Sequence, residues 1–525
     1  MILDPRLALA GLFASLVYWA YVDTRSARLA TGTRSAWPTE LSILLLALSA
    51  AVLTGAAIAT APLVVAGAVI AVSVFAAVLV RPVIGAYALL GLTPLIVGID
   101  RGRMLPLLRP NEALLILVAA ALVTRHAWWW AAGKRYETVT SGRVLKAALA
   151  VVFTSTVVPI LWLVARGLPL TLDDLTHAMT LAKYVVLFLV IRDVVRTTAQ
   201  ARTCVAISVT VGAMVGLIGA LQSLGLFGVP QLLEAYYLPP FQGAEVLDAG
   251  RGSSTIANAI AVGDVLTFNL LLVLAFMLRG SISKRVAAVA IMVLLIGVVG
   301  SGQISAFLLL GVGFLALGFI TRTTPFLVPR AALAAGAATI VLFPVIQRRI
   351  EGFGSGGEGG GFLPLSWEIR WSNLTEHFWP VLFSGWNWLL GVRPFPRLEA
   401  PEGIKDFIFI ESGYTYLLWT GGIPLLAAFV WLMYEAIKAT AAVARSRTDD
   451  ISAIAAATYA SFIAVAVLML LDPHHIMRGA GDLLYPMLAL SLTGSGIAHA
   501  ASRRPSDEPS VDARRNLQTR IGATS

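Results

Sequence analysis

The sequence predicts an all-α, polytopic integral membrane protein with roughly 12–15 transmembrane helices and one large extracytoplasmic loop. Hydrophobic residues make up 58% of the chain and charged residues only 13%, against roughly 25% charged in an ordinary soluble domain. The apolar residues gather in runs close to the about 20 residues that a helix needs to cross a bilayer. One long polar stretch, residues 347–411, interrupts these runs. The composition therefore excludes a water-soluble globule.

The apolar runs predict the membrane spans in chain order. The expected spans are 7–22, 41–58, 62–80, 82–99, 111–124, 147–164, 177–191, 204–221, 261–278, 286–300, 305–320, 331–345, 414–434, 454–471 and 483–499. The first run follows Arg6 in the manner of a signal peptide. No small-residue cleavage site is evident after it, so we expect a retained helix.

Basic connectors predict the topology, because short cytoplasmic loops are rich in Lys and Arg. The basic connectors are 125–146, 192–202, 279–285, 322–330 and 438–447. Alternation then places the other connectors on the outer side, namely 100–110, 166–175, 222–258, 347–411 and 472–482. The expected organisation is a multi-helix membrane domain (1–346), an extracytoplasmic loop (347–411), C-terminal transmembrane helices (412–500) and a disordered cytoplasmic tail (501–525).

Charge and motif content exclude several classes of function. The net charge of +10 is spread over short connectors between apolar runs, which is a topology signal, so no nucleic acid partner is expected. The single cysteine, Cys204, excludes disulfides, Cys-based zinc sites and iron–sulfur clusters within one chain. The chain carries no metalloprotease, nucleophile-elbow, phosphate-loop or dinucleotide motif.

Arg251 opens a segment that suits phosphate binding. Small and hydroxyl residues and then Asn258 follow it, just before the helix expected at 261–278. A guanidinium, hydroxyls and exposed amides at a helix start act together on phosphate oxygens. The alternative is an interfacial arginine that only anchors the helix end.

Arg370 begins a predicted short amphipathic helix in the large loop. The apolar face of this helix carries Leu374, Phe378 and Val381 or Leu382. A charge on an apolar face is costly without a partner, so Arg370 is a candidate for function. The neighbouring tryptophans, Trp371 among them, are interpreted as an interfacial belt or as sugar-stacking groups.

Glu411 borders the next transmembrane helix and has two interpretations. A carboxylate at a partly dry boundary is suited to act as a general base. Alternatively, Ser412 caps the helix and Glu411 complements its dipole.

Charged residues inside or beside the spans supply further candidates. Lys183 and Asp264 lie at membrane depth, where ionisable groups are functional candidates by default, or they form a structural pair with each other. Two acidic or histidine clusters were weighed as divalent-cation sites and interpreted instead as solvated loop clusters, because neither has the ligand spacing of a metal motif. They are Asp173 with Asp174, and Asp472 with His474 and His475. No metal site is predicted.

Taken together, these residues resemble the O-antigen ligase and O-antigen polymerase family of bacterial envelope enzymes over most of the chain. Arg370 and Leu374 match an Arg-x-x-x-Leu motif in a large periplasmic loop. Glu411-Ser412, then nine residues and Gly422, keep the spacing of a second motif, although Glu411 replaces a histidine and Leu425 replaces its last residue. The Arg251–Asn258 segment resembles a third motif, whereas Ser301-Gly302-Gln303 lacks the arginine of a fourth.

The resemblance implies a glycan polymerase or ligase in the bacterial cytoplasmic (inner) membrane, multi-pass and with a cytoplasmic C-terminus. The loss of the ligase histidine favours a polysaccharide polymerase or a ligase for another glycan. The expected reaction transfers an oligosaccharide from a polyprenyl diphosphate carrier to a sugar acceptor on the outer face, with inversion and without a metal or other cofactor. The implied partners are the lipid-linked donor, the glycan acceptor, the bilayer and other polysaccharide assembly proteins.

In this hypothesis Arg251 and Arg370 hold the diphosphate and Glu411 accepts the proton of the attacking hydroxyl. Substrate binding is assigned to Lys183, Asn258, Ser412, Tyr414 and Trp371. The rival hypothesis is a transporter or flippase of a lipid-linked glycan, with Lys183 and Asp264 as its internal charged site. A non-catalytic partner of a polysaccharide machine, and a metal-dependent transferase that uses Asp173 or Asp174, are further alternatives.

Overall fold

The computed structural model describes residues 62–101, 108–133, 142–237, 251–323, 370–399 and 407–493, with a few isolated positions between 329 and 347. The predicted spans 7–22 and 41–58, nearly all of 331–345, and the tail 501–525 lie outside the described residues.

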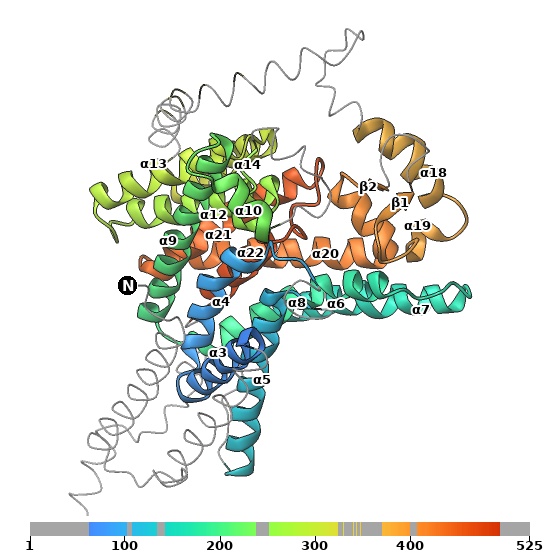
Figure 1. Ribbon diagram of the computed structural model, residues 1–525, viewed down its shortest axis with the longest axis horizontal. Helices are drawn as coiled ribbons and strands as arrows, with labels where there is room; N and C mark the ends of the chain where they lie inside the picture. Colours follow the sequence, from blue (N-terminus) through green and yellow to red (C-terminus); the bar gives the residue numbers. More distant parts are fainter. Residues whose placement is uncertain are drawn as a thin grey trace, which may run out of the picture.

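The described chain is almost entirely helical (Figure 1). Eight of its helices are long and apolar enough to cross a bilayer: α5 (Pro110–Ala131), α6 to α7 (Arg143–Ala165), α8 (Leu172–Val194), α9 (Thr198–Ser223), α12 (Ala259–Leu278), α14 (Ile304–Thr321), α20 (Gly413–Ser446) and α21 (Asp450–Leu468). Shorter helices fill other predicted spans, namely α3 (Pro62–Val80), α4 (Val83–Ile96), α13 (Lys284–Gly300) and α22 (Ala480–Ser491). The prediction of an all-α, multi-pass membrane protein is confirmed.

Helix ends are set by capping groups. The Thr197 side chain accepts a hydrogen bond from the Gln200 amide at the start of α9, and the Asn258 side chain accepts from the Ile260 and Ala261 amides at the start of α12. Each cap satisfies backbone donors that have no partner inside the helix. The observed helices therefore begin a few residues before the apolar runs that predicted them.

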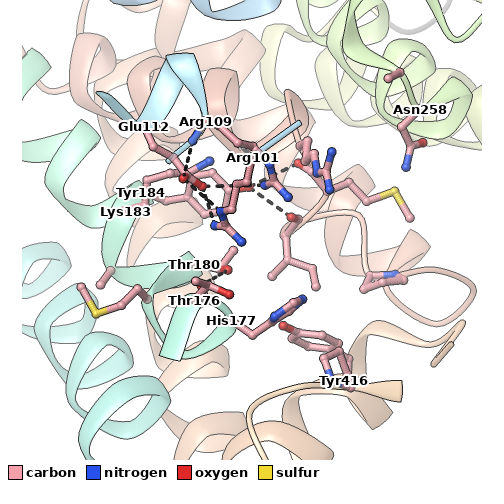
Figure 2. A pocket seen from close by; sticks show the side chains of 18 of the residues that line it. Arg101, Arg109, Glu112, Thr176, His177, Thr180, Lys183, Tyr184, Asn258 and Tyr416 are labelled. Carbon is pink, nitrogen blue, oxygen red and sulfur yellow. Dashed lines mark hydrogen bonds and ion pairs between the residues drawn. The ribbon is translucent and has the colours of Figure 1, made fainter. Parts of the chain in front are cut away.

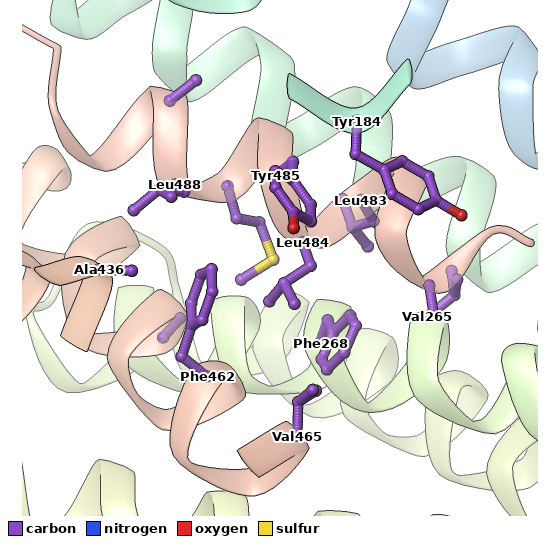
Figure 3. Close-up of a cluster of buried hydrophobic side chains, with 14 of the residues drawn as sticks. Tyr184, Val265, Phe268, Ala436, Phe462, Val465, Leu483, Leu484, Tyr485 and Leu488 are labelled. Atoms are coloured by element: carbon purple, nitrogen blue, oxygen red, sulfur yellow. The ribbon is translucent and has the colours of Figure 1, made fainter. Parts of the chain in front are cut away.

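Helix α12 is the centre of the bundle. It is buried along nearly its whole length and packs against α9, α13, α14 and α21. Figure 3 shows the apolar core where side chains of α12, α20, α21 and α22 meet, with Tyr184 of α8 stacked on Tyr485 at 5.4 Å between ring centroids. A helix that is apolar on all sides suits this central position.

The described part of the large loop carries secondary structure of its own and lies beside α20 (Figure 1). Its elements are the π-helical turn η3 (Asn373–Phe378), α18 (Trp379–Leu382), α19 (Asn387–Leu390), β1 (Arg397–Glu399) and β2 (Phe407–Phe409). The two strands pair antiparallel with Leu398 opposite Ile408. The predicted amphipathic face is confirmed, since Leu374, Phe378 and Leu382 are all buried.

A break in α20 holds this loop in place. Gly422 has φ +64° and ψ −159° within the helix, a conformation that favours glycine. A Cβ atom at Gly422 would lie 2.2 Å from the Leu389 carbonyl oxygen, so α19 packs directly on the break. The glycine that carries the second motif therefore allows a close backbone contact between the loop and α20.

Contacts between connectors bring several of the connectors predicted to be basic together. Among the connectors predicted to be basic, the Arg202 guanidinium donates to the Ser281 carbonyl at 2.9 Å, and the Arg279 guanidinium donates to the Ala444 carbonyl at 2.9 Å. These contacts bring 192–202, 279–285 and 438–447 close to one another. The connectors predicted to face outward meet around one cavity.

Candidate functional site

Five connectors meet around one cavity of about 860 Å³ (Figure 2). Each of the segments predicted to lie on the outer side, 100–110, 166–175, 222–258, 347–411 and 472–482, supplies lining residues. The charged lining residues are Arg101, Arg109, Glu112, Lys183, Arg251, Glu411, Asp472 and Arg478. Five of these are cationic and three are carboxylates, and Lys183 and Arg478 pair with Asp482 and Asp100 outside the lining. With those two carboxylates and Arg370 included, the site keeps one more cation than carboxylates, which favours an anionic ligand.

Four of the residues predicted for the site line this cavity. They are Arg251, Lys183, Asn258 and Glu411. Asn258 is also the N-cap of α12, and its side-chain oxygen accepts hydrogen bonds from the Ile260 and Ala261 amides. Segments that are far apart in the sequence therefore converge on one cavity.

Arg370 adjoins the cavity through its two carboxylate partners. Its guanidinium contacts Asp472 at 2.8 Å and Glu411 at 3.5 Å, and both carboxylates line the cavity. Asp472 is almost fully buried, and this burial raises the pKa of its carboxyl even though Arg370 acts to lower it. The Arg370 charge is thus compensated by a pair of carboxylates.

Of the two interpretations of the Glu411-Ser412 pair, helix capping applies to Ser412, and a position at the candidate site applies to Glu411. The Ser412 side chain accepts from the Thr415 amide at 3.4 Å and caps α20. The Glu411 carboxylate is about one-third exposed (35%) and lies beside Arg370 at the edge of the cavity. The capping role therefore belongs to Ser412, whereas Glu411 lines the cavity.

Three predicted substrate-binding residues do not line the cavity. Besides the cap Ser412, the Tyr414 hydroxyl donates to the Ala466 carbonyl at 2.7 Å and joins α20 to α21. Trp371 is 61% exposed and meets Trp379 edge-on. All three have structural contacts that account for them.

Lys183 and Asp264 do not pair with each other, which corrects one of the two predicted alternatives. Lys183 bonds Asp482 of α22 at 3.0 Å, because this face of α8 packs against α22. Asp264 bonds His474 at 2.9 Å with both side chains fully buried, because α12 turns Asp264 towards the connector after α21. Each charge is neutralised by the C-terminal part of the chain.

The histidine and acidic clusters are largely buried, so their interpretation as solvated loops is wrong. Asp472, His474 and His475 are between 0 and 2% exposed. Asp174 is fully buried as well, whereas Asp173 is exposed. In the part of the chain that the structure describes, no three His, Cys, Asp or Glu side chains are grouped to hold a metal ion.

Asp174 fastens the large loop over the cavity. Its carboxylate accepts from the Arg393 guanidinium at 2.7 and 3.1 Å and from the Phe395 amide at 3.3 Å. Phe395 packs on His177 with 4.5 Å between ring centroids, and both residues line the cavity. A bidentate ion pair of this kind fixes direction as well as distance.

A second group of cations in the cavity escaped sequence reasoning. Arg101 and Arg109 share the Glu112 carboxylate at 2.8 and 3.7 Å, as Figure 2 shows, and Arg478 bonds Asp100 at 3.1 Å. Burial lowers the pKa of Arg109 to about 10. The available signal was four arginines in two short connectors assigned to the outer side, namely Arg101, Arg103, Arg109 and Arg478.

His475 gives the protein a specific acid sensitivity. Burial, with a smaller effect of the His474 charge, lowers the pKa of His475 to about 3. Below the ordinary histidine value of about 6.5 the unfolded chain binds a proton that the folded chain does not, so stability falls by about 1.4 kcal/mol per pH unit. We expect His475→Gln to flatten this dependence, adding about 2 kcal/mol of relative stability between pH 6.5 and 5.0, measured by melting in detergent.

The pKa of His474 is shifted in the opposite direction to that of His475, so the two histidines have opposite effects on the pH dependence of stability. Burial acts to lower the pKa of His474, but the charge of Asp264 and its hydrogen bond outweigh burial and raise this pKa. The protonated His474 side chain therefore contributes fully to stability below pH 6.5. This contribution is lost as the pH rises through the raised pKa that His474 has in the folded state. An unchanged acid slope in His475→Gln would contradict the assignment.

The cavity thus combines surplus positive charge, a carboxylate at its edge and a loop fastened over it. Neither models of protein families nor curated proteins match the chain when they are compared with it.

Proposed function

We propose that the protein is a glycan polymerase or ligase that transfers an oligosaccharide from a polyprenyl diphosphate carrier to a sugar hydroxyl. The reaction takes place at the outer face of the bacterial cytoplasmic membrane. The bilayer, the lipid-linked donor and the glycan acceptor are its partners, and other polysaccharide assembly proteins are further partners.

One observation carries this proposal. Arg251 and Glu411, predicted separately from the sequence, border a single cavity together with Asp472, the second carboxylate that contacts Arg370. The volume of about 860 Å³ lies within the range of sites that bind extended small ligands, about 300–1,000 Å³. An anionic leaving group next to a hydroxyl acceptor needs this combination of fixed positive charge and a base.

The proposed chemistry is a single displacement at the anomeric carbon. Glu411 accepts the proton of the acceptor hydroxyl while the oxygen forms the new glycosidic bond. The bond between the anomeric carbon and the carrier phosphate breaks, and the carrier diphosphate leaves with the electron pair. Attack opposite the leaving group inverts the configuration.

Guanidinium groups hold the departing diphosphate in this scheme. Arg251 faces the cavity, and the Arg101 and Arg109 pair supplies more positive charge than Glu112 neutralises. Arginine is charged at any working pH and binds phosphate oxygens through two parallel hydrogen bonds. The scheme therefore draws its charge from the protein, and chelators are expected to leave the rate unchanged.

Incubation of the purified protein with lipid-linked oligosaccharide tests the proposal. An enzyme of this class yields longer or transferred glycan and free carrier diphosphate, detected by mass spectrometry. Relocation of the lipid across a vesicle membrane without a new covalent product would support the rival, a transporter or flippase. Loss of transfer on chelation would instead favour a metal-dependent transferase.

A further inference from the structure

The connector between α21 and α22, residues 469–479, touches every segment proposed to act in the reaction. Its Asp472 bonds Arg370, its Met469 carbonyl accepts from the Gly413 amide beside Glu411, and a Cβ on its Gly479 would lie 3.1 Å from Ile256 in the Arg251–Asn258 segment. Its Ile476 carbonyl accepts from the Tyr184 hydroxyl of α8. This connector is therefore in a position to align those segments.

A buried ion pair anchors the connector to the central helix. The Nδ1 atom of His474 lies 2.9 and 3.0 Å from the two carboxylate oxygens of Asp264, and both side chains have no exposed surface. Placing two ionisable groups in the interior is costly unless their geometry is well matched, and removing one leaves the other unpaired. Apolar residues would serve packing alone at lower cost, so the pair calls for a further role.

A short series of contacts links the Asp264–His474 pair to Arg370. The His474 amide donates to the Asp472 carbonyl at 2.8 Å, which closes the turn that carries the Asp472 side chain. Asp472 in turn contacts Arg370 at 2.8 Å, and Arg370 lies 3.5 Å from Glu411. Acidic and basic side chains alternate along the series Asp264, His474, Asp472, Arg370 and Glu411 from the core to the cavity.

We propose that Asp264 and His474 are positioning residues: their buried pair fixes the turn that holds Asp472, and Asp472 fixes the Arg370 guanidinium beside Glu411. This role rests on the proposed transfer function, because it acts on residues assigned to that reaction. The contacts themselves exist independently of it.

The first test measures Arg370 directly, without any glycan. Phenylglyoxal modifies accessible guanidinium groups, and mass spectrometry of the full-length protein in detergent gives the rate at Arg370 relative to Arg166. Asp264→Leu removes the anchor, and we expect the relative rate at Arg370 to rise about tenfold, as residues of one coupled network respond together.

Asn269 offers a matched control on the same helix. It is buried on α12 and bonds Ser208 at 2.7 Å, away from the connector. Asn269→Leu therefore removes a buried polar contact of α12 without touching the anchor, and Arg370 should keep its wild-type rate. Equal reactivity of Arg370 in Asp264→Leu and wild type would overturn the proposal, as would an equal rise in Asn269→Leu.

Two further variants keep the test decisive if Asp264→Leu does not fold. Asp264→Asn retains a hydrogen-bond acceptor for His474 but loses the charge, and should raise the Arg370 rate about threefold. The exchanged pair Asp264→His with His474→Asp restores opposite charges and should return the rate towards wild type. Wild-type reactivity in Asp264→Asn, or no rescue by the exchange, would count against a positioning role.

The transfer assay then separates this inference from the proposed function. If the protein transfers glycan, Asp264→Asn should lower kcat about tenfold with KM within about threefold, because misplaced catalytic groups affect the chemical step. If Arg370 reactivity responds as expected but no glycan is transferred by the wild type, the proposed function fails and the positioning role stands. If transfer occurs and kcat is unaffected by Asp264→Asn, the positioning role fails alone.

Discussion

On the proposed transfer function, we expect Arg370→Lys to lower the rate of glycan transfer by about 10²- to 10³-fold, the loss typical of removing one group that stabilises developing negative charge. A lysine carries the same charge but cannot contact Asp472 and Glu411 together through a planar guanidinium. Glu411→Gln removes the proposed base and is expected to cost about 10²- to 10⁴-fold. The rate is measured with purified protein and lipid-linked oligosaccharide, after equal amounts of folded protein have been verified.

The variant that combines Arg370→Lys with Glu411→Gln, and a control variant at Arg166, make this test more specific. Because Arg370 and Glu411 are in contact, the losses in rate caused by the two substitutions should not add. The double variant should therefore be about as active as the less active of the two single variants. Arg166 is a matched control, since it bonds Asn387 at 3.0 Å on the same side of the bundle and is not among the lining residues. Arg166→Lys should keep the rate within about fivefold of wild type. A full rate in Arg370→Lys would remove Arg370 from the mechanism.

We expect Gly252→Ala to displace the Arg251–Asn258 segment and to remove most of the proposed transfer activity. A Cβ atom at Gly252 would lie 2.4 Å from the Gly219 carbonyl oxygen and 2.9 Å from that of Gly300. Neither is a flexible side chain, so the segment itself has to move, and overpacking of this kind costs about 1–3 kcal/mol. A shift of about 1 Å in Arg251 is expected to lower the transfer rate about 10²-fold.

Gly311 supplies the comparison for this variant. It lies within α14, and an added Cβ would meet no atom within 4 Å. Gly311→Ala should raise the melting temperature slightly, since alanine is the better helix former, and leave transfer unchanged. Wild-type transfer in Gly252→Ala would show that the close approach of this segment to α9 and α13 is not required.

The membrane-spanning helices were the most predictable part of the fold. The run 62–80 predicted α3 to the residue, because apolar length is what a bilayer selects. Helices α8 and α9 begin several residues earlier than expected, because Thr171 and Thr197 cap polar first turns that carry no apolar signal. Sequence therefore located the helices, and capping chemistry set their ends.

The site was predictable where a residue stood out from its surroundings. Arg370 stood out because a charge on an apolar face is costly without a partner, and Glu411 because a carboxylate at a partly dry boundary is suited to act as a base. The structure places the two side chains in contact. Asp264 and His474 were identified separately, but nothing local indicates that residues 210 positions apart form a pair. Polar residues between two spans look solvated in a sequence, and only the packing around α12 shows them buried.

Residues 469–479 also determine when the cavity can form during synthesis. The ribosome releases this connector after α12, the large loop and α20, all of which depend on it for alignment. A nascent chain that stops before α21 therefore contains Arg251, Arg370 and Glu411 without the element that assembles them. On the proposed function, we therefore expect activity to arise only after α21 and α22 enter the bilayer, and ribosome-bound intermediates should remain inert towards lipid-linked glycan.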